Sequence, residues 1–387
     1  MNFMTRMESV QTPIIPVIGK LIRDNPGTIS LGQGVVFYPP PSVAIAASIS
    51  DFFADPKNHQ YKSVHGIPEL ITILTEKLQK DNQIELGNER AIVVTAGGNM
   101  AFINALLAIT NPGDEIILNT PYYFNHEMAI NMASCQAILV ETDKDYQLCP
   151  EAIEANITPK TRAVVTISPN NPTGTVYPQS ALKRVNEICK KHSIYHIHDE
   201  AYEYFTYNGI SHFSPASLED SDHHSIGLYS LSKAYGFASW RIGYMVIPQH
   251  LFGAIDKIQD TILICPPVIS QYAAIGALKA GKQYCQQHLE TLENIRRIVL
   301  NRLEELGDIC TFSLGEGAFY FFLKIKTQLQ DFELVKKLIE DYKIAVLPGS
   351  TFGVGEGCYL RLAYGNLDRE TVTEGMDRLV KGLKAIA

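Results

Sequence analysis

A lysine in the segment SLSKAYGFASWRIGY, residues 230–244, has neighbours that suit amine chemistry. Lys233 lies between Ser230 and Arg241, two residue types that bind phosphate well. A lysine that is desolvated beside cationic groups has a lowered pKa, so its neutral amine can attack an aldehyde. The alternative for a single lysine in a loop is a solvated side chain. Other segments therefore decide between the two interpretations.

An acid and a tyrosine follow a β-rich run in the segment HDEAY, residues 198–202. Asp199 directly at the carboxyl end of a strand can face a cationic group in a cleft, such as the protonated ring nitrogen of a cofactor. Tyr202 lies three residues on, one helical turn away, and could reach the same ligand. The alternative is that Asp199 caps a helix.

Two further segments place turn residues after β-rich runs. In TAGGN, residues 95–99, two glycines between a strand and a helix let backbone N–H groups approach a phosphate. In SPNNPTG, residues 168–174, Asn171 precedes a proline and is therefore biased away from helix, which presents its amide at a turn. Simple turn chemistry explains either segment by itself.

These segments share one position, the end of a predicted strand. From about residue 90, short β-rich runs alternate with helical stretches such as 99–109 and 178–192, which predicts a mostly parallel α/β sheet with helices on both faces. Ligands of such sheets lie outside the carboxyl ends of the strands. The predicted strands are 91–95, 115–119, 136–140, 162–168, 194–198, 225–230 and 242–246.

The remaining chain predicts a smaller α+β unit. Residues 1–45 are rich in Pro and Gly and read as irregular, residues 268–306 read as one long helix, and Asp368 is a plausible N-cap of a closing helix. We expect a large domain at 46–270 and a small domain made of 1–45 plus 271–387. The other predicted elements are strands at 317–325, 344–348 and 358–365 and a helix at 331–342.

The composition excludes several classes of function. With a net charge of -8, the 387-residue chain is a poor partner for nucleic acid. Seven cysteines without a CxxC pair predict reduced thiols and a cytoplasmic protein. No apolar run is long enough to span a membrane. His196 and His198 would share a strand face, yet no acid or cysteine completes a ligand set, so we expect no metal.

The ordered set TAGGN, NNPTG, DEAY, SLSKAYG…WRIGY and YLRLAYG resembles the class I/II aminotransferases, which are fold-type-I enzymes dependent on pyridoxal 5'-phosphate (PLP). The resemblance runs from LGQG, residues 31–34, to RLAYG, residues 361–365. It implies that Lys233 carries the cofactor as a Schiff base and then shuttles a proton. It also implies that Asp199 pairs with the pyridine nitrogen.

The resemblance assigns further roles around the cofactor and the substrate. Asn171 and Tyr202 would hydrogen-bond the phenolic oxygen, and Tyr123 would stack on the ring. Arg361 would clamp the substrate carboxylate, helped by Asn171 and by the backbone of Gly34. The phosphate would be held by Gly98, Asn99, Ser230 and Arg241, and by Tyr61 of a neighbouring subunit, which implies a homodimer with active sites at the subunit interface.

The function implied is transfer of an amino group from an L-α-amino acid to a 2-oxo acid in a ping-pong cycle. Val35 and Val36 stand where many relatives have a phenylalanine and an acid, which puts the substrate-side contacts in question. We expect a neutral donor of the methionine, glutamine or aromatic type. The alternatives are a PLP-dependent β-lyase acting on sulfur amino acids, and a non-catalytic PLP-binding regulator.

Overall fold

Seven strands between Arg90 and Pro248 form the main sheet of the computed structural model, which describes residues 5–386. Their order is β2-β8-β7-β6-β5-β3-β4, and only β8 runs antiparallel to its neighbours. This confirms the mostly parallel α/β sheet. The strands are β2 (Arg90–Thr95), β3 (Glu115–Thr120), β4 (Gln136–Glu141), β5 (Thr161–Ile167), β6 (Tyr195–Asp199), β7 (Ser225–Ser230) and β8 (Gly243–Pro248).

Helices cover both faces of this sheet because alternate strand residues point to opposite sides. Ile116 and Leu118 of β3 pack in one apolar cluster with residues of α4, α5 and α9, whereas Ile117 packs in another with residues of α6 and α7. These helices are α4 (Gly98–Ile109), α5 (Phe124–Met132), α6 (Pro150–Ala155), α7 (Gln179–Lys191) and α9 (Phe252–Leu263).

A second, antiparallel sheet has the order β12-β13-β10-β9. Beside it, β1 (Ile29–Ser30) pairs with β11 (Ile344–Ala345). Asp368 accepts the backbone N–H of Thr371 at 2.9 Å, which confirms it as the cap of the last helix. The remaining elements are β9 (Cys310–Phe312), β10 (Tyr320–Ile325), β12 (Leu347–Pro348), β13 (Cys358–Ala363), α12 (Asp331–Tyr342) and α13 (Arg369–Ile386).

Three predicted elements were wrong. The segment 1–45 is not irregular, since it holds α1 (Ile14–Asp24) and the start of α2 (Ser42–Ala54). Prolines precede both helices, at a position where the missing N–H costs nothing. The helix predicted over 268–306 breaks at Gly281 (φ 70°) into α10 (Val268–Ala280) and α11 (Lys282–Glu304). The strand predicted over 344–348 divides into β11 and β12, which pair in different sheets.

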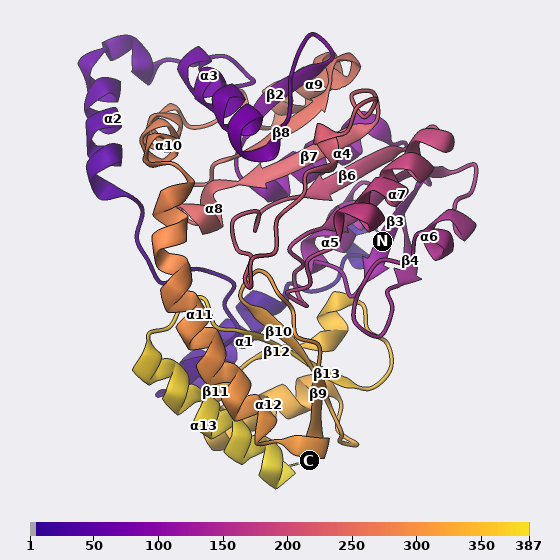
Figure 1. Cartoon of the computed structure of the whole chain (residues 1–387), viewed down its shortest axis with the longest axis vertical. Helices are drawn as coiled ribbons and strands as arrows, with labels where there is room; N and C mark the ends of the chain where they lie inside the picture. The colour runs from indigo at the N-terminus through magenta and orange to yellow at the C-terminus, as the bar shows by residue number, and fades with distance from the viewer. Residues whose placement is uncertain (1–4, 387) are drawn as a thin grey trace.

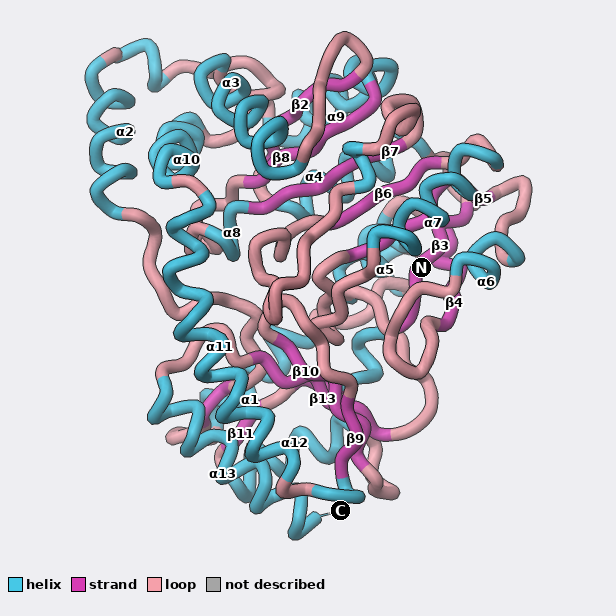
Figure 2. Tube along the Cα trace, in the orientation of Figure 1, coloured by secondary structure: helices cyan, strands magenta, loops and turns pink. Residues whose placement is uncertain are grey.

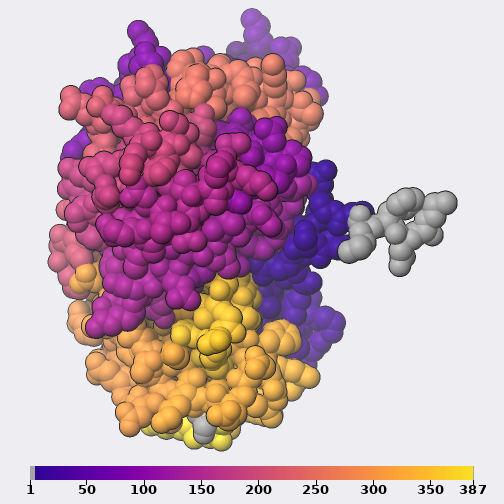
Figure 3. Space-filling model, turned by 90° about the vertical axis from the view of Figure 1, so that its right-hand side faces the viewer, coloured from indigo at the N-terminus to yellow at the C-terminus, as the bar shows by residue number. Residues whose placement is uncertain are grey.

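The division into two domains stays a proposal. α10 packs against α2 and α3 (Pro68–Lys77), beside the large sheet, whereas α11 packs against α13. In Figure 1, α11 runs from the level of the large sheet to the smaller one. Figure 3 shows the indigo N-terminal segment lying where the purple and the orange parts of the chain meet. By these contacts, a boundary at Gly281 describes the packing better than one at residue 270.

Two further observations concern the helices and the cysteines. No helix within residues 5–386 is long and apolar enough to cross a membrane. All seven cysteines are free thiols. The cytoplasmic location stays a prediction.

Candidate active site

A cavity of about 380 Å³ opens between the two sheets. Figure 2 shows that the segments passing between the two sheets are mostly loops. All the predicted site residues except Tyr61 line the cavity. The lining is Ile15, Gln33, Gly34, Val35, Gly98, Asn99, Tyr123, Phe124, Ile167, Asn171, Asp199, Ala201, Tyr202, Ser230, Ser232, Lys233, Arg241, Tyr320 and Arg361.

Lys233 reaches the cavity from α8 (Leu231–Ala234), the single helical turn that follows β7. Its Nζ donates to the carbonyl oxygen of Gly34. Burial, and then the charges of Arg361 and Arg241, lower the pKa of Lys233 to about 8, and Asp199 opposes them. The side chain therefore has an appreciable neutral fraction near pH 7, as the sequence interpretation requires.

One corner of the cavity collects donors suited to a phosphate. The hydroxyl of Ser230 lies at the start of α8, and Arg241 stands nearby in a left-handed conformation (φ 54°). Gly97 precedes α4 at φ 84°, and a Cβ there would lie 2.6 Å from Nη2 of Arg241. The first free N–H groups of α4 belong to Gly98 and Asn99. A helix N-terminus, a hydroxyl and a guanidinium together form an anion site.

Asp199 is held by a residue that the sequence interpretation missed. Its Oδ2 lies 3.2 Å from Nε2 of His126, and its Oδ1 accepts the backbone N–H of Ala201 at 3.0 Å. His126 is buried and stacks on Phe102, with ring centroids 4.0 Å apart. The available signal was its position in the first turn of α5, three residues after Tyr123, which precedes that helix. The capping alternative for Asp199 was wrong, because residues 201–204 form a turn and no helix begins there, so the Ala201 contact is a local turn contact.

Arg361 is a buried cation without an acidic partner among residues 5–386. It lies in β13, where Nη1 donates to Oδ1 of Asn171 at 3.0 Å and Nη2 donates to the carbonyl of Gly32 at 2.6 Å. Its Nε is buried without a hydrogen-bond partner. A desolvated guanidinium with a free N–H suits a carboxylate from a ligand.

Tyr320, at the start of β10, is a second residue that was missed. Its hydroxyl lies 2.6 Å from the hydroxyl of Tyr202, and the Arg361 guanidinium lies 4.7 Å from its ring centroid. Any side chain at Gly34 would collide with this hydroxyl. The sequence predicted a strand here, but strand periodicity gives no indication of which strand faces across a cavity.

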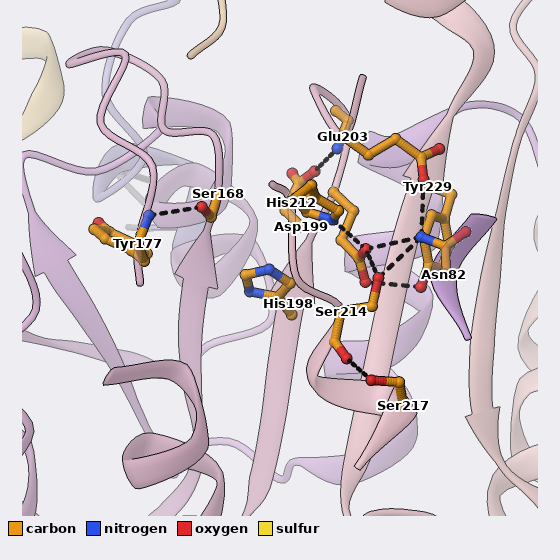
Figure 4. Close-up of polar contacts among 12 residues, drawn as sticks. Asn82, Ser168, Tyr177, His198, Asp199, Glu203, His212, Ser214, Ser217 and Tyr229 are labelled. Carbon is orange, nitrogen blue, oxygen red and sulfur yellow. Dashed lines mark hydrogen bonds and ion pairs between the residues drawn. The ribbon is translucent and has the colours of Figure 1, made fainter. Parts of the chain in front are cut away.

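A buried polar network lies behind the site. The Glu200 carboxylate accepts hydrogen bonds from Tyr229 at 2.7 Å, from His212 at 2.7 Å and from Ser214. Figure 4 draws His212, Ser214 and Tyr229 with the dashed contacts of this network. The network joins the turn after β6 to the end of β7 and so fixes the two segments that carry Asp199 and Lys233.

Tyr61 does not reach the cavity of its own chain. It is 79% exposed and follows a short turn after α2. The prediction that it reaches the site of a neighbouring subunit stays a prediction.

The comparisons with known proteins agree with this geometry. Residues 26–379 match the sequence model of the family "Aminotransferase class I and II". The chain is 33% identical to an aromatic aminotransferase of Arabidopsis thaliana, covering 97% of this chain and 94% of that protein. It is also 33% identical to an aspartate aminotransferase of Pyrococcus abyssi, covering 82% of each.

Solved structures show the same fold. An aspartate aminotransferase of Rhizobium meliloti superposes with a TM-score of 0.91 at 28% identity over 100% of both chains. An aromatic aminotransferase of Pyrococcus horikoshii superposes with a TM-score of 0.87 at 29% identity over 95% of this chain and 99% of that one. The chain belongs to the class I and II aminotransferases, the PLP-dependent transferases of fold type I.

Proposed function

We propose that the protein moves the amino group of a neutral L-α-amino acid with an aromatic or other apolar side chain to a 2-oxo acid. The observation that carries this proposal is the set of cations in the cavity. Among the described residues that line it, the cationic side chains are those of Lys233, Arg241 and Arg361. The first two face the cofactor in this proposal, so one cation remains, and it serves the α-carboxylate.

The side-chain end of the substrate then meets apolar groups. Ile15 of α1, Val35 and Phe124 line the cavity. A second carboxylate placed against these groups would be desolvated without a partner, at a cost of several kcal/mol. An aromatic or aliphatic side chain instead gains about 25 cal/mol for each Å² that it buries. Methionine and glutamine remain within the proposed range, and an aromatic donor fits the lining best.

The residues present fit PLP in detail. The anion corner at Ser230, Arg241 and the start of α4 suits the phosphate, and Asp199, oriented by His126, suits a protonated ring nitrogen. When bound, PLP supplies the electron sink that stabilises charge at the substrate Cα. We assign Asn171 and Tyr202 to its phenolic oxygen and Tyr123 to its ring face.

The chain's own residues orient the substrate and move the proton. Arg361, held by Asn171 and Gly32, fixes the carboxylate as a planar fork. Lys233 is neutral in an appreciable fraction near pH 7 and can take the proton from Cα. A positioned base is typically worth about 10²–10⁴-fold in rate.

The relatives support transfer over the alternatives. The Arabidopsis relative and one from Thermococcus litoralis are named as aromatic aminotransferases, whereas others are named for aspartate. None of these names describes a β-lyase or a regulator.

We also propose a homodimer in which Tyr61 of each subunit reaches the phosphate of the other. Because some relatives are named for aspartate, the main alternative is an aspartate donor whose side-chain carboxylate binds a cation supplied by the partner subunit.

The test is a donor panel followed in the visible spectrum of the PLP-loaded protein. Phenylalanine, tyrosine, methionine, glutamine and aspartate are each added without an oxo acid. We expect the absorbance of the bound cofactor to bleach fastest with an aromatic donor and to return when a 2-oxo acid is added. Faster bleaching with aspartate would overturn the substrate class. With S-methylcysteine added as a sixth donor, release of thiol and pyruvate without bleaching would indicate a lyase, and a protein that takes up no PLP would refute the cofactor role of Lys233.

A further inference from the structure

Two buried hydroxyl groups meet where the two sheets face the cavity. Tyr202 follows β6 of the large sheet and Tyr320 opens β10 of the smaller one. Their oxygen atoms are 2.6 Å apart, and their rings meet edge to face with centroids 5.5 Å apart. Both residues line the cavity and both are buried. The hydrogen bond therefore joins the two sheets beside the proposed position of the cofactor.

The hydrogen bond between the two hydroxyls has a direction, because one of them donates and the other accepts. Burial raises the pKa of both hydroxyls, so each carries its proton at neutral pH. Only one of the two can donate within the pair, and the other keeps its proton for a third group. Neither hydroxyl has another hydrogen-bond partner among residues 5–386. The pair therefore presents one donor to the cavity, from one tyrosine or from the other.

The surroundings of Tyr320 favour one direction. The Arg361 guanidinium lies 4.7 Å from the centroid of the Tyr320 ring. A cation against the ring polarises the O–H bond and makes Tyr320 a good donor. The backbone of Gly34 closes the space on the other side of this hydroxyl, where even a methyl group would collide with it. These contacts favour Tyr320 as the donor to Tyr202, which would leave the Tyr202 proton free to point into the cavity.

We propose that Tyr320 is a positioning residue that donates to Tyr202 and thereby commits the Tyr202 proton to the phenolic oxygen of the cofactor. The inference rests on the proposed function, in which Tyr202 contacts that oxygen. A hydroxyl that accepts one hydrogen bond donates a stronger one, by about 10–30%. Because the Tyr202 proton stabilises the deprotonated cofactor, losing the Tyr320 hydroxyl should raise the pKa of the bound cofactor.

The experiment is a spectrophotometric pH titration of the PLP-loaded protein and three variants. Tyr202→Phe should raise the pKa of the bound cofactor by roughly 1–2 units, the worth of one hydrogen bond to a charged group. Tyr320→Phe should raise it by about 0.1–0.7 unit. The double variant should titrate like Tyr202→Phe alone, since Tyr320 acts only through Tyr202. Tyr364→Phe removes a buried hydroxyl away from the cavity and is the control.

The outcomes separate this inference from the proposed function. An unchanged pKa in Tyr320→Phe, or a double variant whose shift equals the sum of the two single shifts, overturns the role of Tyr320 and leaves the function intact. A wild-type protein that binds no PLP overturns the proposed function and this inference with it. A Tyr320→Phe shift that disappears in the Tyr202→Phe background supports the inference.

A second substitution covers the case in which Tyr320→Phe does not fold. Placing 3-fluorotyrosine at position 320 keeps the ring and the hydroxyl and makes the hydroxyl more acidic. The donor to Tyr202 is then stronger, so the pKa of the bound cofactor should fall instead of rising. A rise, or no change, would contradict the assigned direction of the hydrogen bond.

Discussion

The lowered pKa of Lys233 predicts how the stability of the cofactor-free protein depends on pH. Burial first, and then the charges of Arg361 and Arg241, lower this pKa from an ordinary 10.5 to about 8. The unfolded chain keeps the ordinary value. Between the two values, the unfolded state binds a proton that the folded state has lost, so the free energy of unfolding rises with pH. Below pH 8, the folded state bears the full cost of the buried charge.

The size of the effect follows from the same two values. A shift from 10.5 to about 8 corresponds to at most about 3 kcal/mol, and water that reaches the amine through the open cavity makes it smaller. The substitution Lys233→Met keeps most of the side-chain length and removes the titrating group. At pH 7, we expect the cofactor-free variant to be more stable than the wild type by up to this amount. The difference should shrink as the pH rises from 8 towards 10.5.

The assay is urea unfolding of the two cofactor-free proteins at several values between pH 7 and pH 10. Subtracting one series from the other cancels the titration of every group that the two proteins share. Lys279→Met, at an exposed position, reports the effect of the same exchange outside the cavity. A stability difference between wild type and Lys233→Met that stays constant over this range would refute the lowered pKa, and with it the neutral amine.

Two substitutions test other parts of the site. Arg361→Lys keeps the charge but loses the planar fork held by Asn171, so kcat/KM for an aromatic donor should fall roughly 10²-fold in steady-state assays. An equal rate in the variant would contradict the carboxylate role. Gly97→Ala introduces a Cβ 2.6 Å from Nη2 of Arg241, so PLP affinity measured by equilibrium dialysis should fall about 10-fold or more. Gly113→Ala adds a Cβ at a similar positive φ (90°) with nothing within 4 Å of it, and should lose stability without losing PLP affinity.

The sequence located much of the site because of a property of parallel sheets. The strands β2, β5, β6 and β7 run in one direction, so the segments after them meet at one edge of the sheet. Asn171 and Lys233 follow such a strand, and Asp199 is the last residue of one. Their positions could therefore be predicted before any distance was known. Arg361 came from the family resemblance, because it lies within a strand of the other sheet and no strand end indicates it.

The residues that were missed depend on contacts between distant segments. His126 contacts Asp199 from α5, and Tyr320 contacts Tyr202 from the smaller sheet, across 118 residues of chain. No local pattern encodes such a pairing. The helix break at Gly281 was not predicted, for another reason. A glycine inside a helical pattern costs only about 1 kcal/mol, so apolar periodicity alone does not show where packing ends one helix and starts the next.

Three hydrogen bonds cross the cavity, and each involves a residue that we assign to the cofactor or to the substrate. Lys233 donates to Gly34, Arg361 donates to Asn171, and Tyr320 meets Tyr202. A ligand group bound at Lys233 competes with Gly34 for the same amine, whereas a carboxylate at Arg361 can use N–H groups that Asn171 and Gly32 leave free. The Tyr320–Tyr202 contact also need not be exchanged, because its remaining proton points into the cavity, and unlike the Arg361–Asn171 contact it joins two hydroxyl groups whose donor and acceptor could be reversed. Of the two contacts that need not be exchanged when the site is loaded, the tyrosine pair is therefore the one that could run either way, which is why its direction bears on the chemistry.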